Sequence, residues 1–219
     1  GLRLDNAAFL ACARRGREFP RESWALLGLL AIWDQRPQWT DDRWLAFILG
    51  YVAHETGGFS IRKESLDYRT AGRIMEIWPQ HFATIDEAAQ YVGQPEKLAN
   101  KVYGGRFGNR EPDDGWRYRG RGLVQLTGRD EYRRYGRLIG VDLESVPDLI
   151  LDPEIGAKVA FAQAFPLGSI NRLAPFFRED PADYEGAIRL LRGGSFGIAE
   201  IVLRVKTFES CIKQTKRGQ

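Results

Sequence analysis

Residues 44–53 are apolar at almost every position, and this run limits the folds open to the chain more than any other feature. The polar run 40–42 (Thr-Asp-Asp) precedes it and offers side-chain oxygens that can cap the first turn of a helix. Gly57 and Gly58 follow its end. A helix that is apolar on all sides is buried on all sides. We therefore expect a buried central helix around which other helices pack.

Helical spacing of apolar residues recurs along much of the remaining chain. Residues 103–116 are rich in Gly, Asp and Asn and predict a long surface loop. Residues 118–127 alternate weakly and predict a short strand or extended segment. This pattern is typical of a mainly α protein with a minor β element, forming a single domain over residues 1–219. The further helices that we expect span 21–33, 70–78, 85–92, 95–102, 129–139, 153–165, 180–191 and 196–213.

The charge of the chain does not favour a nucleic-acid partner. The formal net charge is +3, and basic and acidic residues alternate without a block of about five or more like charges. This mild basicity favours contact with anionic polymers such as bacterial envelope material, although ordinary solubility accounts for it equally well. We expect the protein to be a monomer.

Two cysteines, Cys12 and Cys211, lie near opposite ends of the sequence. Chain ends often lie close together, so one disulfide is conceivable. Free Cys is nevertheless among the most buried residue types, and we expect two buried free thiols. No apolar run approaches the ~18 residues of a membrane-spanning helix. The first residues lack the regions of a signal peptide, so we expect delivery by a holin, a secretion system or another export route.

Glu55 is the first candidate for chemistry because it ends the apolar run. Its helical neighbours are Val52, Tyr51 and Ile48, and partial burial on this face would raise the pKa of its carboxyl group. A carboxyl group that stays protonated can donate a proton to a leaving oxygen. The alternative is an exposed glutamate at a helix end. The adjacent His54 is expected to orient structure rather than to act as an acid or base.

Glycoside hydrolysis usually needs a second carboxylate. Glu64 follows nine residues later, after the glycine pair, and the chain can fold back there so that Glu64 faces Glu55. Asp67 is the local competitor. The alternative for both is a solvated carboxylate on a loop.

A third candidate cluster lies in residues 118–128, whose sequence is YRGRGLVQLTG. Gln125 and Thr127 share one face at a period of two, where an amide and a hydroxyl group could bind an N-acetyl sugar and hold a water. The alternative is a glycine turn in which Thr127 caps the following helix. The sequence contains no metal motif, since His54 and His81 are far apart and neither CxxC nor HExxH occurs. We expect neither a metal nor a cofactor.

Together these segments resemble glycoside hydrolase family 19, which contains plant-type chitinases and many bacteriophage endolysins. The resemblance rests on HETGGF at 54–59, ESLDY at 64–68 and YRGRGLVQLTG at 118–128. It covers residues 44–135 strongly and extends weakly to residue 213. Residues 97–103 and the glycine-rich loop after them are more similar to the endolysin branch.

The resemblance implies a lysozyme-like fold with a deep substrate cleft and hydrolysis with inversion at the anomeric carbon. It implies Glu55 as the general acid and Glu64 as the base that activates water. Thr127 matches a hydroxyl residue that helps to hold this water, and Gln125 matches an amide that contacts the substrate. Further substrate-binding candidates are Tyr118, Arg121, Arg192 and His54.

The chain departs from the family pattern near its C-terminal end. Arg192 stands where the family usually has Asn before two glycines, and Phe196 stands where chitinases often have Glu. Arg204 would keep the basic member of the chitinase charge network. A cation at Arg192 would favour an anionic glycan, which points to peptidoglycan rather than chitin. The alternative is a surface arginine turned away from the cleft.

The sequence therefore predicts a lysozyme-like glycosidase that cuts β-1,4 bonds between the amino sugars of peptidoglycan and acts on the bacterial cell wall, in the periplasm or outside the cell. A chitinase is the second hypothesis. A glycan-binding module without activity is the third, and the presence of both Glu55 and Glu64 argues against it, because a binding module needs no carboxyl pair.

Overall fold

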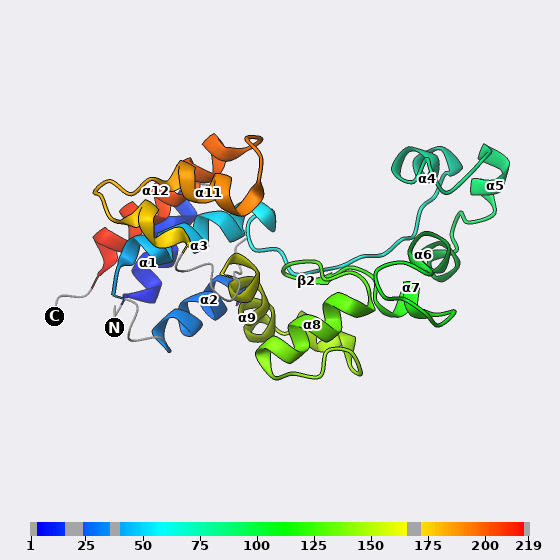
Figure 1. The fold of residues 1–219 in the computed structure, drawn as a ribbon, viewed down its shortest axis with the longest axis horizontal. Coiled ribbons are helices and arrows are strands. Elements are labelled where there is room, and N and C mark those ends of the chain that lie inside the picture. Colours follow the sequence, from blue (N-terminus) through cyan, green and yellow to red (C-terminus); the bar gives the residue numbers. More distant parts are fainter. Residues whose placement is uncertain (1–3, 16–23, 36–39, 166–171, 217–219) are drawn as a thin grey trace. The chain divides into compact units, whose positions relative to one another are not determined.

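The computed structural model is mainly α-helical and contains one two-stranded sheet in its described part (Figure 1). The predicted mainly α fold is therefore confirmed. The chain divides into two compact units, Gly1–Ile61 with Pro153–Gln219 (unit 1) and Arg62–Asp152 (unit 2). The single domain over residues 1–219 stays a prediction, because compactness does not tell whether either unit folds alone. The residues that the structure describes are 4–15, 24–35, 40–165 and 172–216.

In unit 1, helix α3 (Asp42–Glu55) is the predicted buried helix, with residues such as Phe47 fully enclosed. Asp41 caps it by accepting a hydrogen bond from a backbone N–H of the first turn at 3.0 Å. Helix α12 (Ile198–Thr215) packs along α3 so closely that a Cβ at Gly50 would lie 2.5 Å from Val205 Cγ2. Glycine at this position therefore lets the two helix backbones approach.

The other described helices of unit 1 pack around α3 and α12. Helix α2 (Trp24–Asp34) lies against α9 (Pro153–Ala164), where Gly28 sits beside the backbone of Pro153. Aromatic rings fill the space next to α3, and Trp44 stacks on Phe177 with ring centroids 4.0 Å apart. The remaining elements are α1 (Asn6–Arg15), η2 (Ala174–Phe177) and α11 (Tyr184–Arg192).

Cys12 of α1 and Cys211 of α12 form a disulfide, so the prediction of two free thiols is wrong. Helix α1 packs against α12 and brings the two Cα atoms to 5.7 Å, a separation that a disulfide can bridge. The bond joins residues 199 positions apart. It therefore closes most of the chain into one covalent loop.

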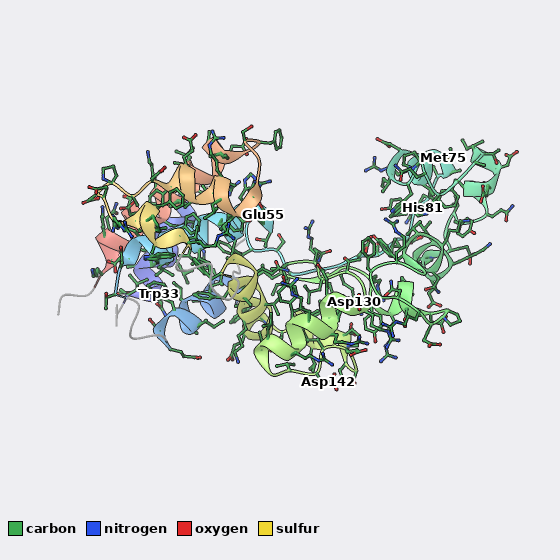
Figure 2. The ribbon with its side chains drawn as sticks, in the orientation of Figure 1. Trp33, Glu55, Met75, His81, Asp130 and Asp142 are labelled. Atoms are coloured by element: carbon green, nitrogen blue, oxygen red, sulfur yellow. A yellow bond between two sulfur atoms is a disulfide. The ribbon has the colours of Figure 1, made fainter. Side chains whose placement is uncertain are left out.

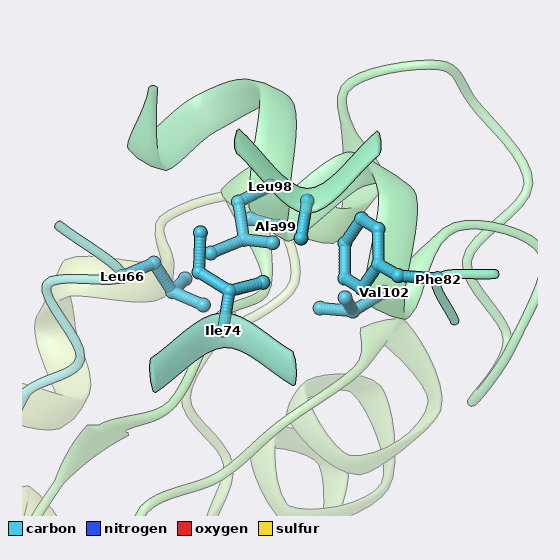
Figure 3. Packing of buried hydrophobic residues seen from close by; sticks show 7 residues of the cluster. Leu66, Ile74, Phe82, Leu98, Ala99 and Val102 are labelled. Carbon is cyan, nitrogen blue, oxygen red and sulfur yellow. The ribbon is translucent and has the colours of Figure 1, made fainter. Parts of the chain in front are cut away.

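Unit 2 is built from short helices, a small sheet and an apolar core. Strands β1 (Arg62–Lys63) and β2 (Arg121–Gly122) pair antiparallel, with Arg62 opposite Gly122. The core cluster in Figure 3 consists of Leu66, Ile74, Phe82, Ala88, Leu98, Ala99 and Val102. The helical elements are α4 (Ala71–Ile77), α5 (Ile85–Ala89), α6 (Pro95–Tyr103), α7 (Asp114–Arg117), α8 (Arg129–Ile139) and η1 (Pro147–Leu151).

The predicted helices that fall within the described residues are present, with shifts at their ends. Helix α8 has the predicted bounds, whereas α11 begins later than predicted because the side chain of Asp183 caps it. The sequence did not indicate α1, η1 or η2, and the predicted loop 103–116 contains most of the short helix α7. Residues 21–23, the predicted start of the helix now seen as α2, lie outside the described residues.

Among the residues that the structure describes, no helix is long and apolar enough to cross a membrane. The described part of the chain also brings together no group of three His, Cys, Asp or Glu side chains that could hold a metal ion.

Candidate active site

Glu55 is the last residue of α3, and Figure 2 shows its side chain at that end of the helix. The side chain is 41% exposed, so it is partly buried but keeps wide contact with solvent, which is closer to the exposed helix-end alternative. Its carboxyl group is paired instead with a cation of the same unit. Arg192, at the end of α11, places Nη1 3.2 Å from Glu55 Oε1.

Three further residues of unit 1 lie next to this ion pair. Tyr51 is one turn before Glu55, and burial raises the pKa of its hydroxyl; the charge of Glu55 adds to this rise and the charge of Arg192 opposes it. His54 is mostly buried, with Nδ1 3.9 Å from a carboxylate oxygen of Glu200. The predicted orienting role of His54 fits this position, while direct substrate contact stays a prediction.

Glu64 of unit 2 is held at both oxygens of its carboxylate. The hydroxyl group of Tyr103 donates to Oε1 at 2.8 Å, and the backbone N–H of Gly120 donates to Oε2 at 3.0 Å. The backbone of Glu64 is held as well, because Arg119 Nε donates to its carbonyl oxygen at 3.1 Å. The orientation of this carboxylate is therefore fixed from two sides.

Tyr103, Arg119 and Gly120 are site residues that the sequence reasoning missed. Burial raises the pKa of the Tyr103 hydroxyl, and the nearby charge of Glu64 raises it further, so this hydroxyl is a hydrogen-bond donor at neutral pH. The Tyr103–Glu64 contact spans 39 positions of sequence and the Gly120–Glu64 contact spans 56. Contacts between residues so far apart in sequence leave no local sequence pattern. The only sequence signal for these residues was the high density of glycine near residue 120.

Three side-chain oxygens of unit 2 converge above Gly120. A Cβ atom at this residue would lie 3.0 Å from Gln125 Oε1, 3.1 Å from Glu64 Oε2 and 3.4 Å from Thr127 Oγ1. A side chain at residue 120 would therefore crowd all three groups, and glycine keeps the space between them open. The structure thus brings together the predicted site residues Glu64, Gln125 and Thr127.

The hydrogen bonds of Gln125 and Thr127 show which of their atoms remain to contact a ligand. Gln125 Nε2 donates to the carbonyl oxygens of Arg62 and Gly122, each at 2.9 Å, so the amide nitrogen ties the two strands together. Its Oε1 points toward the space above Gly120. Thr127 Oγ1 donates to the Gln125 carbonyl at 3.2 Å. The residue at the N-cap of α8 is Gly128, so Thr127 does not cap that helix.

Tyr118 and Arg121 are placed differently from what the sequence led us to expect. Tyr118 is 1% exposed, and its hydroxyl donates to the carbonyl oxygen of Glu144 at 2.9 Å. Arg121 is 5% exposed, with Nε 2.7 Å from Asp148 Oδ1 and Nη1 donating to Tyr132 Oη at 3.2 Å. Both side chains stabilise the interior of unit 2, so neither is positioned to contact a glycan. A two-residue strand gave too little alternation to show which side chains face inward.

A comparison with a known protein places the chain in a family, although no family model matches the chain. A Haemophilus influenzae protein described as a glycosyl hydrolase family 19 domain-containing protein is 33% identical over 160 residues, which are 71% of this chain and 73% of that protein. The chain belongs to glycoside hydrolase family 19. This family 19 protein is therefore a glycosidase, as the resemblance predicted, while its place in the endolysin branch stays a prediction.

Solved family 19 structures show the same fold. Chitinase C from Streptomyces griseus HUT6037 aligns with a TM-score of 0.55 and 18% identity, covering 100% of this chain and 80% of that one. A bacterial family 19 chitinase aligns with a TM-score of 0.51 and 19% identity, covering 95% of this chain and 94% of that one. At these identities the likeness concerns the fold alone, which confirms the predicted lysozyme-like, mainly α fold.

Proposed function

We propose that this family 19 glycosidase hydrolyses β-1,4 bonds between the amino sugars of peptidoglycan, with Glu55 as general acid and Glu64 as general base. The observation that carries this proposal is the convergence of Glu64, Gln125 and Thr127 on the open space above Gly120. A buried water needs two to four polar partners, and these groups supply carboxylate, amide and hydroxyl oxygens on one side. An oriented carboxylate beside a bound water is the arrangement that base catalysis requires.

The proposed reaction uses one carboxyl group for each of two proton transfers. Glu55 gives its proton to the glycosidic oxygen as the bond from that oxygen to the anomeric carbon breaks. A water attacks the anomeric carbon from the opposite face and gives a proton to Glu64, which then releases it to solvent while Glu55 takes up another. Inversion by this route requires the two carboxyl groups to lie about 6.5–9.5 Å apart, with room for the water.

The preference for peptidoglycan over chitin is supported by charge. Arg192 places a guanidinium beside the proposed acid, and peptidoglycan carries lactyl and peptide carboxylates that chitin lacks. The formal net charge of +3 also favours an anionic polymer. Chitin is the second candidate substrate, because the solved structures with the same fold include chitinases.

The disulfide supports action outside the cytoplasm. Disulfides form and persist in oxidising compartments such as the periplasm and the extracellular space, and Cys12 and Cys211 are joined. We therefore propose that the enzyme meets its substrate in the cell wall after export.

The test is to incubate purified peptidoglycan and chitin oligomers with the wild type, Glu55→Gln and Glu64→Gln, and to identify new reducing ends by mass spectrometry. Each variant keeps the shape of the side chain and loses its proton transfer, so turnover should fall at least ~100-fold. Asp67→Asn is the matched control, since Asp67 is an exposed carboxylate on the loop that carries Glu64. It should keep the wild-type rate.

The outcomes separate the candidate functions. New ends from peptidoglycan with wild type support the proposal, and new ends from chitin alone support the chitinase. Binding to either polymer without new ends would support an inactive glycan-binding module. Activity of Glu55→Gln within a few-fold of wild type would remove Glu55 from the role of acid.

A further inference from the structure

The ion pair between Arg192 and Glu55 is a single contact between one nitrogen and one oxygen. Arg192 Nη1 is buried and lies 3.2 Å from Glu55 Oε1, yet among the described residues it has no partner aligned for a hydrogen bond. A bidentate arginine–carboxylate pair, by contrast, has two parallel hydrogen bonds. The contact therefore depends on charge and lacks aligned hydrogen bonds, so a second carboxylate can compete for the guanidinium.

The turn after α11 fixes where Arg192 can reach. Gly193 ends the helix with φ +69°, and Gly197 begins α12 with φ +73°. A Cβ at Gly197 would lie 3.2 Å from His54 Nε2 and 3.6 Å from Arg192 Nη1, so the backbone of the turn covers this nitrogen. The Arg192 side chain keeps 25% of its surface exposed. Part of its side chain is therefore accessible to a ligand while Nη1 faces Glu55.

This contact opposes the role that Glu55 has in the proposed reaction. The ion pair with Arg192 engages Glu55 as a carboxylate, whereas a general acid must hold a proton when the glycosidic bond breaks. Tyr51, one of the polar groups beside the pair, is half-buried and keeps its own proton at neutral pH, because burial raises the pKa of its hydroxyl. Glu55 is therefore best suited to its role when another anion draws Arg192 away.

We propose that Arg192 is a specificity-determining residue that senses substrate charge: a carboxylate on the glycan takes its guanidinium from Glu55 and frees that carboxyl group to act as acid. This inference rests on the proposed function. Glu55 then takes a proton from solvent and passes it to the glycosidic oxygen as the bond breaks. A lactyl or peptide carboxylate of peptidoglycan supplies the competing charge, and a neutral N-acetylglucosamine polymer supplies none. The charge of the substrate therefore acts on kcat more than on KM.

The test uses soluble oligosaccharides of alternating N-acetylglucosamine and N-acetylmuramic acid, with the lactyl group either as free acid or as its neutral methyl ester. Values of kcat and KM are measured for wild type, Arg192→Asn and Arg192→Lys. In wild type, kcat should favour the acid by about 10- to 100-fold, the scale of a hydrogen bond to a charged group. In Arg192→Asn, Glu55 is free with either substrate, so kcat should rise on the ester and change little on the acid. Arg192→Lys should retain most of the preference.

Arg189→Asn is the matched control, because Arg189 lies on the same helix and pairs with Glu185 at an exposed position. It should keep the wild-type ratio of the two kcat values. Equal loss by Arg192→Asn on both substrates, an unchanged ratio, or a preference expressed in KM alone would overturn the role of Arg192. The Glu55→Gln variant distinguishes this failure from failure of the proposed function. If Glu55→Gln stays active, Glu55 is not the general acid and the proposed function fails. If Glu55→Gln is inactive, only the role of Arg192 is in question.

Discussion

The two proposed catalytic carboxyl groups are held in opposite ways by the two units. Glu55 stands at the exposed end of a regular helix whose middle is buried, and among the described residues its charged contact is with Arg192. Glu64 lies in an irregular segment beside a two-residue strand, and each of its carboxylate oxygens accepts a hydrogen bond. The difference matches the tasks proposed for them. A base that orients water gains from a fixed carboxylate, whereas an acid has to change its charge and partners during each cycle.

The largest expected effect concerns what holds unit 1 together. Replacing both cysteines, as Cys12→Ser with Cys211→Ser, should lower the free energy of unfolding by about 3–5 kcal/mol, because the bond closes a loop of most of the chain. Denaturant unfolding measures this change. Hydrogen exchange should then quicken in α1 and α12 of unit 1 and change little in α8 of unit 2. An equal increase of hydrogen exchange in both units would contradict the view that the disulfide chiefly stabilises unit 1.

A smaller effect is expected at the fixed carboxylate of unit 2. Tyr103→Phe removes the hydroxyl that donates to Glu64 Oε1, and a hydrogen bond to a charged group of this kind should be worth about 10- to 100-fold in kcat, with little change in KM. Tyr91→Phe is the control, since the Tyr91 ring packs on Phe82 in the same unit. If Tyr103→Phe changes kcat by less than threefold, the carboxylate does not depend on this contact for its position.

Sequence patterns predicted the part of the site that belongs to regular secondary structure, which is Glu55 at the end of its helix. The apolar run 44–53 and the glycines after it indicated both the buried helix and the place of Glu55 at its end. They could not indicate Arg192 as its partner, because that contact depends on how α11 meets α3. Residue type and spacing made Glu64, Gln125 and Thr127 candidates, and the family resemblance gave each of them a role.

The parts that sequence reasoning missed or misplaced all depend on contacts distant in sequence. Tyr103 reaches Glu64 across 39 positions, and Cys12 reaches Cys211 across 199. Tyr118 was taken for a ligand contact because its neighbours matched a binding motif, whereas its side chain fills the interior of unit 2. A motif identifies the segment that forms a site, but packing decides which of its side chains face the ligand.

The smallest expected effect is electrostatic and lies in unit 2. Hydrogen bonds from Arg133, with a further one from Arg129, lower the pKa of Glu144 from 4.5 to about 2. A carboxylate with a lowered folded-state pKa adds stability that is present above about pH 4.5 and lost as the pH falls toward 2. The pair is partly exposed to solvent, so Glu144→Gln should reduce stability at pH 7 by only about 1 kcal/mol or less. Thermal unfolding at pH 7 and pH 3 checks this, and an undiminished difference between wild type and variant at the lower pH would contradict it.

The most direct test of the paired action of Glu55 and Glu64 is the configuration of the first product. Proton NMR spectra recorded during the first minutes of hydrolysis of a β-1,4 amino-sugar oligomer report the anomeric proton of the new reducing end before it mutarotates. Two carboxyl groups that act on opposite faces of the sugar, with water between them, give the α-anomer first. Initial formation of the β-anomer would show retention and contradict the assignment of Glu64 as a base that activates water.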